Sequence, residues 1–294
     1  MKDYKDFLED VKDGLNAYYG EDGRASVTRV EKNNDVQYYG ITIRNTDSNI
    51  STVIHMEGEF ERFRSEGMLE NVIRRVVQFH ETHAARFSID TETIRDYGKM
   101  KERLICKLVG YERNKKRLQN LPHIRYLDLA VVFCCDMTRE GFGAASFEVQ
   151  KKLFDEWAID LETLKEDAFH NAPKIRPAKI RRIEEVLGTL MGENVDALCI
   201  PEMYVLTTEQ QQYGASGLLY PDVLKDFAKE KACNFYILPS SVHEVILLGD
   251  IGNYDPKMMA EMVREINISQ VEDIEVLSDG VYYYDRMEER VIRL

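Results

Sequence analysis

The stretch that most constrains the fold runs from Cys199 to Asp250. It contains two short runs of β-forming apolar residues, Met203–Leu206 and Phe235–Leu238, and a third, Val242–Leu248, directly after a Pro-Ser-Ser turn. Between the first two lies Pro221–Lys231, whose apolar residues recur at the spacing of one helical face. The stretch therefore predicts a strand–helix–strand–strand unit, which restricts the chain to folds that combine sheets with helices.

The residues before this unit predict two lobes. Lys2–Tyr19 has the apolar spacing of an amphipathic helix, and Asn33-Asn34-Asp35 separates two β-rich runs, which is typical of a hairpin. A further helix is predicted at Met68–Ala84. We expect an N-terminal α/β lobe over residues 1–98 and a larger C-terminal α+β lobe over residues 99–294. The fold class is α+β, with mixed, mostly antiparallel sheets and flanking helices.

Within the larger lobe, Tyr126–Asp136 is the clearest strand, because it is apolar on both faces and so belongs in the centre of a sheet. Ala144–Val149 is its predicted hairpin partner. Asp128 interrupts the apolar run, and a buried carboxylate needs a cation or several N–H donors nearby. We therefore expect Arg125, or another residue of the basic stretches 99–125 and 174–182, beside it. A helix is predicted at Leu161–Ala172, with Asp160 as its N-cap and Pro173 directly after its end. Ala178–Met191 is predicted to be a further helix.

Composition excludes several classes of function. The net charge of −13 disfavours general affinity for nucleic acid or anionic membranes. No apolar run approaches the roughly 20 residues that cross a bilayer, and the charged N-terminus lacks the apolar segment of a signal peptide. The five cysteines stand in apolar segments without a CxxC pair, which favours reduced core thiols. We therefore expect a cytoplasmic protein with no membrane partner and no cofactor.

A basic band interrupts the acidic composition. Lys99–Arg125 holds nine Lys or Arg against two acids, and Lys174–Arg182 holds five against none. A patch with few aromatic residues suits contact with phosphate better than base stacking. The band is equally consistent with two solvated helix faces, or with pairing to the acidic part of the chain. The candidate binding residues are Lys115, Lys116, Arg117, Arg176, Lys179, Arg181 and Arg182.

Ser241 and His243 are the candidate catalytic residues. Two positions apart on a strand, they share one face, and a Ser–His pair is the first requirement of nucleophilic catalysis. No GxSxG motif accompanies them, and the sequence identifies no orienting acid. The alternative is that Ser241 completes the turn after Pro239 while His243 hydrogen-bonds the backbone in the wall of a strand.

Two other clusters do not match known motifs. His80 and His83 are three residues apart at the end of a helix, whereas a zincin needs a spacing of four, and no third ligand is evident. We therefore predict no metal site there. Gly214 and Gly217 match neither the dinucleotide-binding nor the P-loop pattern, so a nucleotide loop is not expected.

Five segments of the second half of the chain occur in a characteristic combination. They are MYVLT (Met203–Thr207), YGASGLLYPDVLK (Tyr213–Lys225), YILPSSVHEVILL (Tyr236–Leu248), MVREIN (Met262–Asn267) and LSDGVYYYDR (Leu277–Arg286). Through them the chain resembles an uncharacterised bacterial domain family of unknown function that is common in gut anaerobes. The resemblance covers nearly the whole chain and implies a full-length member of one family, without implying an activity.

Together these observations favour a non-enzymatic cytoplasmic binding or regulatory protein with a protein partner. One alternative is a hydrolase that uses Ser241 and His243. The other is a phosphate or nucleic-acid binder that uses the basic band in residues 99–125 and 174–182.

Overall fold

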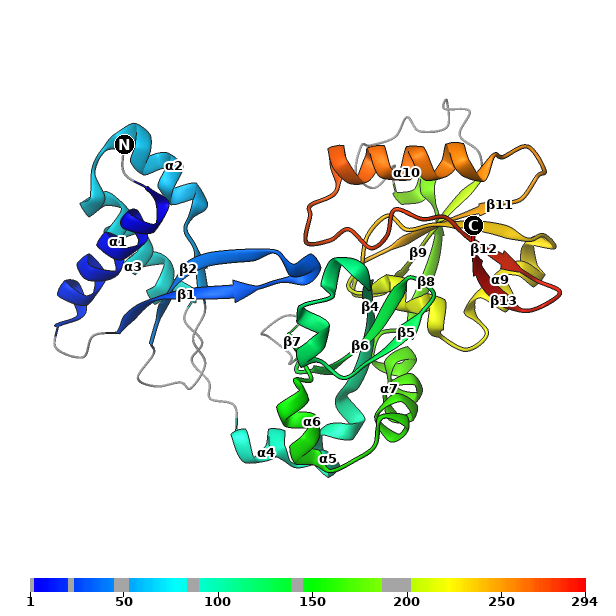
Figure 1. Ribbon diagram of the computed structural model, residues 1–294, viewed down its shortest axis with the longest axis horizontal. Helices are drawn as coiled ribbons and strands as arrows, with labels where there is room; N and C mark the ends of the chain where they lie inside the picture. Colours follow the sequence, from blue (N-terminus) through cyan, green and yellow to red (C-terminus); the bar gives the residue numbers. More distant parts are fainter. Residues whose placement is uncertain (1–2, 21–23, 45–52, 84–89, 139–144, 187–201) are drawn as a thin grey trace. The chain divides into compact units, whose positions relative to one another are not determined.

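The computed structural model describes residues 3–20, 24–44, 53–83, 90–138, 145–186 and 202–294. The chain divides into two compact units, of which the first comprises residues 1–32 and 36–92 and the second residues 33–35 and 93–294. The course of the chain through its elements can be followed in Figure 1.

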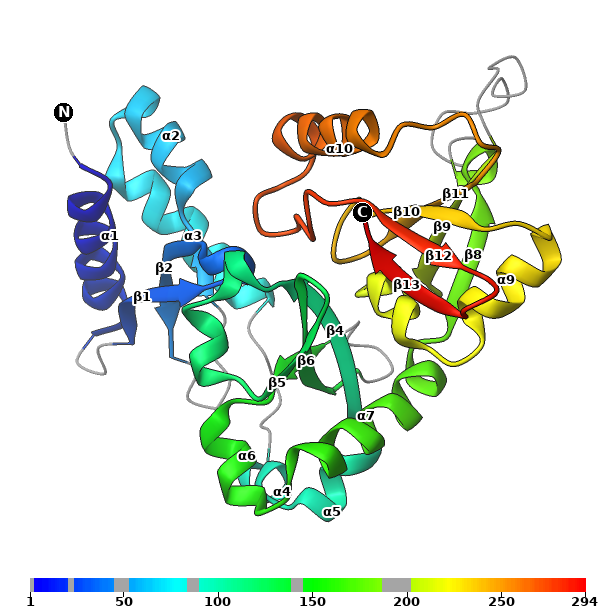
Figure 2. The same ribbon diagram turned by 45° about the vertical axis from the view of Figure 1, so that its right-hand side comes forward.

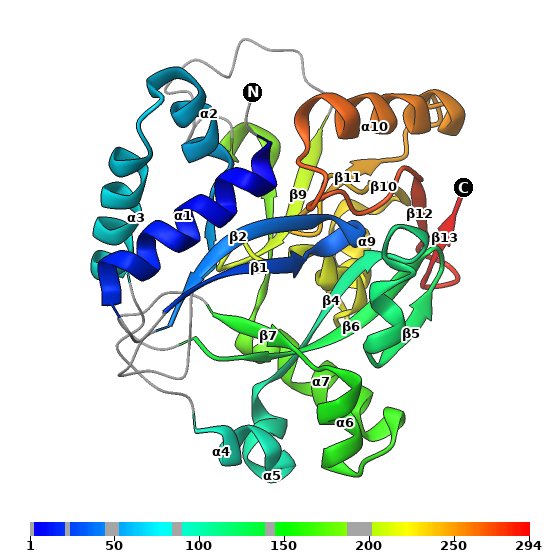
Figure 3. The same cartoon turned by 60° about the vertical axis from the view of Figure 1, so that its left-hand side comes forward.

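The first unit is a three-stranded antiparallel sheet packed against helices (Figure 3). Its core forms because α1 buries Phe7, Leu8, Val11 and Leu15, the residues that recur on one face of the predicted helix. The predicted hairpin is confirmed, and it turns at η2 (Asn33–Asp35), where Asn34 takes the left-handed conformation. The elements are α1 (Tyr4–Tyr19), β1 (Ala25–Glu31), β2 (Gln37–Ile43), β3 (Val53–His55), α2 (Glu57–Glu66) and α3 (Leu69–His83).

The second unit contains two sheets, and the first is built around β6. Residues of β6 are buried along its whole length, as predicted for a central strand, and β7 pairs with it in the predicted hairpin. Its strands are β4 (Leu104–Gly110), β5 (His123–Tyr126), β6 (Leu129–Asp136) and β7 (Ser146–Glu148). Its helical segments are α4 (Thr91–Arg95), α5 (Tyr97–Met100), η3 (Lys101–Arg103), η4 (Glu112–Asn114), η5 (Arg117–Asn120), α6 (Lys151–Trp157) and α7 (Leu161–Ile175).

The second sheet has six antiparallel strands in the order β13-β12-β10-β11-β9-β8. Figure 2 shows α10 along one face of this sheet, where Met259 and Val263 pack on Tyr236 and Leu248. The helix α9 and the turn η7 pack into the main core on the other face. The elements are β8 (Ala178–Arg182), β9 (Met203–Thr208), η7 (Gly214–Leu219), α9 (Val223–Lys231), β10 (Phe235–Leu238), β11 (Val245–Gly249), α10 (Pro256–Gln270), β12 (Tyr282–Asp285) and β13 (Arg290–Arg293).

The fold class is confirmed as α+β with antiparallel sheets, and so is the strand–helix–strand–strand unit. Its third strand, however, begins at Val245 rather than Val242, because the preceding residues form a turn in which the Ser241 N–H donates to the Glu244 carbonyl. All pairings among the described strands are antiparallel.

Two other predictions about local structure need correction. The helix predicted at Ala178–Met191 was wrong at its start, because Ala178–Arg182 form strand β8, which pairs with β9. Residues 183–186 are helical as predicted, and residues from 187 on lie outside the described part. Asp128 is not inside a strand but in the turn between β5 and β6, next to Leu127 in the left-handed conformation. There Asp128 accepts hydrogen bonds from the Ser278 and Tyr282 hydroxyls, and the cation beside it is Arg293, not Arg125.

Candidate functional site

A polar pocket of about 510 Å³ lies in the second unit, where β6 and α7 end. Pockets of this size bind small molecules when a few polar groups converge in them. The wall is formed by a buried ion pair, two exposed cations, one exposed carboxylate, two neutral polar side chains and one apolar side chain. These residues are Asp136, Arg176, Lys99, Arg103, Glu102, Thr138, Gln210 and Ile175.

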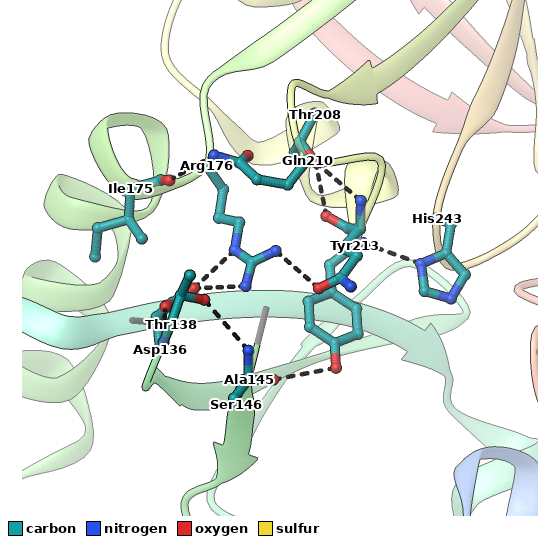
Figure 4. Close-up of polar contacts among 11 residues, drawn as sticks. Asp136, Thr138, Ala145, Ser146, Ile175, Arg176, Thr208, Gln210, Tyr213 and His243 are labelled. Carbon is teal, nitrogen blue, oxygen red and sulfur yellow. Dashed lines mark hydrogen bonds and ion pairs between the residues drawn. The ribbon is translucent and has the colours of Figure 1, made fainter. Parts of the chain in front are cut away.

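The floor of the pocket is the ion pair between Asp136 and Arg176 (Figure 4). Both side chains are buried, and the Arg176 Nε and Nη2 atoms donate to Asp136 Oδ2 at 2.8 and 2.5 Å. Arg176 Nη1 donates to Gln212 Oε1 at 2.9 Å, and the Thr138 N–H donates to Asp136 Oδ1. Because a guanidinium carries five N–H donors and these contacts use three, two donors remain.

The end of α7 positions Arg176. Asp160 caps the start of this helix by accepting the Thr163 N–H, as predicted, and Leu164, Ala168 and Ala172 form its buried face. We expected the helix to stop before Pro173, but it continues to Ile175, and the Arg176 N–H closes the last turn on the Ala172 carbonyl. The guanidinium therefore reaches Asp136 from the helix end.

The loop after β9 brings Tyr213 to the same site. Tyr213 takes a left-handed backbone conformation (φ 55°), which is costly for a non-glycine residue and is found where the surroundings impose it. Its N–H donates to His243 Nδ1 at 3.3 Å, the two rings stack at 5.7 Å, and its hydroxyl shares a hydrogen bond with Ser146 (Figure 4). The Arg176 guanidinium lies 6.0 Å from the centre of the tyrosine ring.

A second buried charge cluster lies beside Tyr213. The side chains of Lys107 and Arg117 both contact the Glu148 carboxylate, and Lys107 Nζ lies 5.2 Å from the centre of the Tyr213 ring. Burial lowers the pKa of Lys107, and the nearby Arg117 guanidinium lowers it further. Burial also lowers the pKa of His243, against the opposing effect of the Glu275 carboxylate 3.7 Å from its Nε2 atom.

The structure places the two candidate catalytic residues in a turn. The Ser241 hydroxyl oxygen accepts the backbone N–H of His243 at 3.0 Å, and the imidazole stacks on Tyr213. Among the described residues, no hydrogen bond joins the Ser241 hydroxyl to the imidazole ring. This geometry gives both residues a structural role and gives the hydrolase alternative no support.

The candidate binding residues do not gather on one surface. Arg117 and Arg176 are buried in ion pairs, and of the seven only Arg176 lines this pocket. Lys115 and Lys116 are exposed between η4 and η5, and the Lys116 N–H donates to Asp35. On β8, Lys179 and Arg182 are exposed, and Arg181 and Arg182 line a separate pocket.

The sequence predicts neither a metal site at His80 and His83 nor a segment that crosses a membrane. In the part of the chain that the structure describes, no group of three or more His, Cys, Asp or Glu is placed to hold a metal ion. The His80 ring packs edge-on against Tyr19, and the side chain of His83 is outside the described part. None of the described helices combines the length and the apolar character that crossing a membrane requires.

Sequence reasoning missed several residues of the site. Lys107 had a readable signal, because it is the one charged residue in the apolar strand β4. Asp136 is the last residue of β6, and a carboxylate at a strand end is usually exposed, so the sequence did not indicate that it is buried. Tyr213 and Gln212 stand in a polar passage without a motif, and only the left-handed backbone of Tyr213 marks them.

The fold and the site define an α+β protein of antiparallel sheets with a polar pocket over a buried Asp–Arg pair. The chain belongs to a family of unknown function, DUF5688, whose family model matches residues 4–286, and the resemblance to such a family is thereby confirmed. No curated protein and no solved structure matches the chain.

Proposed function

We propose that the chain is a non-enzymatic binding protein whose ligand is a small molecule with a phosphate group, held above Arg176. The observation that supports this most is the buried Arg176 side chain on the pocket wall, with two N–H donors that neither Asp136 nor Gln212 uses. A guanidinium matches the geometry of phosphate oxygens and binds them with charge-assisted hydrogen bonds.

The charges of the wall favour an anion. Lys99, Arg103 and Arg176 face two carboxylates, Glu102 and Asp136, and the Asp136 charge is already paired with Arg176. Arg103 is exposed and forms no ion pair with any described residue. An incoming anion therefore meets a net positive rim above a positioned guanidinium.

Binding is favoured over catalysis by the kinds of side chain present. A nucleophile needs a base within hydrogen-bond reach. The hydroxyl in the described wall of the pocket belongs to Thr138, and it accepts a hydrogen bond from the Ala145 N–H. The Gln210 amide donates to the Ile175 carbonyl, so it shapes the wall rather than activating a hydroxyl.

Calorimetric titration with inorganic phosphate at constant ionic strength tests the proposal. Lys99→Gln combined with Arg103→Gln should weaken binding by about tenfold or more, since a hydrogen bond to a charged group contributes about 1.5–3 kcal/mol. The matched control, Lys115→Gln with Lys179→Gln, removes two exposed charges away from the pocket and should bind as the parent does. Absent phosphate binding, or equal weakening in both variants, contradicts the proposal.

Nucleic-acid binding through the basic band is the second candidate. It is supported by Lys115 and Lys116, whose side chains are exposed, although Lys115 Nζ lies 3.4 Å from Glu112 Oε2. Binding of a short DNA duplex should then weaken steeply with salt, and Lys115→Glu with Lys116→Glu should abolish it. DNA binding that is absent at low salt, or unaffected by these changes, removes this candidate.

We also infer that the protein acts in the bacterial cytoplasm and that ligand binding serves a protein partner. The acidic composition and the buried, unpaired cysteines Cys106, Cys134 and Cys135 support a reducing compartment. Cell fractionation of a bacterium that carries the gene tests the location, and recovery of the protein in the membrane fraction would contradict it.

A further inference from the structure

A second cavity, of about 380 Å³, lies in the same unit between η7, α9 and the β12–β13 hairpin. It shares no lining residue with the pocket over Arg176. Three tyrosines line it: Tyr126, Tyr220 and Tyr284. Two of them are almost completely buried, with 6% of Tyr220 and 3% of Tyr284 exposed.

The hydroxyl groups of these three tyrosines form no hydrogen bond with any described residue. By contrast, the hydroxyls of Tyr282 and Tyr283, which precede Tyr284 in β12, donate to Asp128 and Asp250. They are also absent from the set of solvent-inaccessible atoms without a partner, so each hydroxyl is accessible. Burial raises the pKa of all three, to about 12 for Tyr126, so that each hydroxyl stays protonated and both donates and accepts. No described residue therefore competes with a ligand for these accessible hydroxyls.

The rings are held in place even though their hydroxyls are not. Tyr284 stacks on Phe235 with the ring centres 5.0 Å apart, and its strand pairs with both Phe235 and Val291. The Tyr220 N–H closes η7 on the Gly217 carbonyl. The cavity is therefore lined by tyrosines whose rings are fixed by packing and by backbone pairing.

The charged residues of the cavity balance. Lys225 pairs with Glu289 at 2.8 Å, while Asp222 and Arg290 form no ion pair with described residues. Asp222 stands at the start of α9 in the left-handed conformation, and its carboxylate makes no capping hydrogen bond. Two acids and two bases give no preference for a charged ligand, but they supply acceptors and donors around the three hydroxyls.

We propose that this cavity is a ligand site for a neutral polyhydroxylated molecule of monosaccharide size. Sugar hydroxyls both donate and accept hydrogen bonds, and so do the accessible phenol hydroxyls. An anion gains nothing from a balanced set of charges, and an apolar ligand leaves three hydroxyls unpaired. The volume lies within the range of about 300–1,000 Å³ that small-molecule sites occupy.

Saturation-transfer NMR with D-glucose, D-galactose and D-mannose, each added alone to the full chain in phosphate-free buffer, tests the site. At least one hexose should receive saturation from the protein. In Tyr220→Phe with Tyr284→Phe the affinity should fall by about fivefold or more, because two hydrogen bonds to the ligand are lost. The matched control, Tyr18→Phe with Tyr254→Phe, removes hydroxyls outside the cavity and should retain the parent affinity.

A thermal melt of the same variants without sugar separates binding from folding. Because the two hydroxyls have no partner in the chain, Tyr220→Phe with Tyr284→Phe should melt at the parent temperature or above it. Three results overturn the proposal: no saturation of any of the hexoses, unchanged affinity in the variant, or a lower melting temperature, which would show that the hydroxyls already serve the fold. None of these results bears on phosphate binding at Arg176.

Discussion

Replacing Arg176 by methionine isolates the energetic role of the buried ion pair. The Asp136 carboxylate, 6% exposed, then keeps one hydrogen bond, from the Thr138 N–H, and the Gln212 amide oxygen loses its donor. A buried charge left without its partner typically costs about 3–5 kcal/mol, whereas the apolar stem of the side chain is largely retained by methionine. We therefore expect Arg176→Met to lower the free energy of unfolding of the second unit by about 3–5 kcal/mol.

Urea unfolding followed by tryptophan fluorescence measures this loss in the right part of the chain. The single tryptophan of the sequence, Trp157, belongs to the second unit, is 6% exposed, and donates from Nε1 to the Ile94 carbonyl. The matched control is Arg182→Met, which removes an exposed arginine 3.4 Å from Glu184. An exposed ion pair contributes little to stability, so the control should unfold close to the parent midpoint.

Adding Asp136→Asn to Arg176→Met should restore part of the lost stability. The asparagine amide carries no charge, and its oxygen still accepts the Thr138 N–H. The double variant should be more stable than Arg176→Met alone by at least about 1 kcal/mol, as expected for coupled neighbours. A loss below about 1 kcal/mol in Arg176→Met, or strictly additive losses in the double variant, would refute the reasoning.

Three further predictions use the same fluorescence assay. Gly214→Ala should lower the free energy of unfolding by about 1–3 kcal/mol, because its new Cβ would lie 2.3 Å from the His243 carbonyl oxygen. In the control, Gly249→Ala, the new Cβ meets only the Cys233 sulfur at 3.5 Å and should be tolerated. Equal losses in the two variants would contradict this. Because the pKa of His243 is lowered in the folded chain, the unfolded chain binds the proton first as the pH falls. The free energy of unfolding should therefore decrease as the pH drops below about 6.5, and His243→Gln should make this decrease smaller. The same pH dependence in His243→Gln and in the parent would be the contrary result. Glu148→Gln should cost about 3–5 kcal/mol because it removes the carboxylate that two buried cations share. Lys107→Met leaves Arg117 on the carboxylate and should cost under about 1.5 kcal/mol; the reverse order would count against the cluster.

Elements with strong local periodicity were predictable from the sequence. The helix predicted at Lys2–Tyr19 is found at Tyr4–Tyr19, and the hairpin around Asn33–Asp35 turns where it was expected. These elements follow from residues three to four or two positions apart, which the sequence displays directly. The same holds for the central strand β6, whose buried residues need no partner to be recognised.

Elements that depend on distant pairing were not predictable. Ala178–Arg182 were expected to begin a helix, but they form β8 because β9 offers them a ladder of backbone hydrogen bonds. Asp128 was expected to pair with Arg125 or with another residue of the basic band, yet its partners Ser278, Tyr282 and Arg293 come from the end of the chain. Local patterns carry no information about which distant strand will lie beside a residue.

The candidate site was hidden by an error of only three residues at a helix end. A helix that stops at Ala172 leaves an extended chain to Arg176, which advances about 3.3 Å per residue, whereas α7 as found advances about 1.5 Å per residue through Ile175. Over three residues the two paths differ by about 5 Å along the axis and turn the side chain in different directions. That difference exceeds the reach of an ion pair, so the same arginine would be a solvated surface cation on the first path and is the buried partner of Asp136 on the second.

Pro173 favours the first path, since it removes a helical N–H. The chain takes the second, in which Ala172 is buried and Arg176 meets both Asp136 and Gln212, and these contacts offset the cost of proline in the last turn.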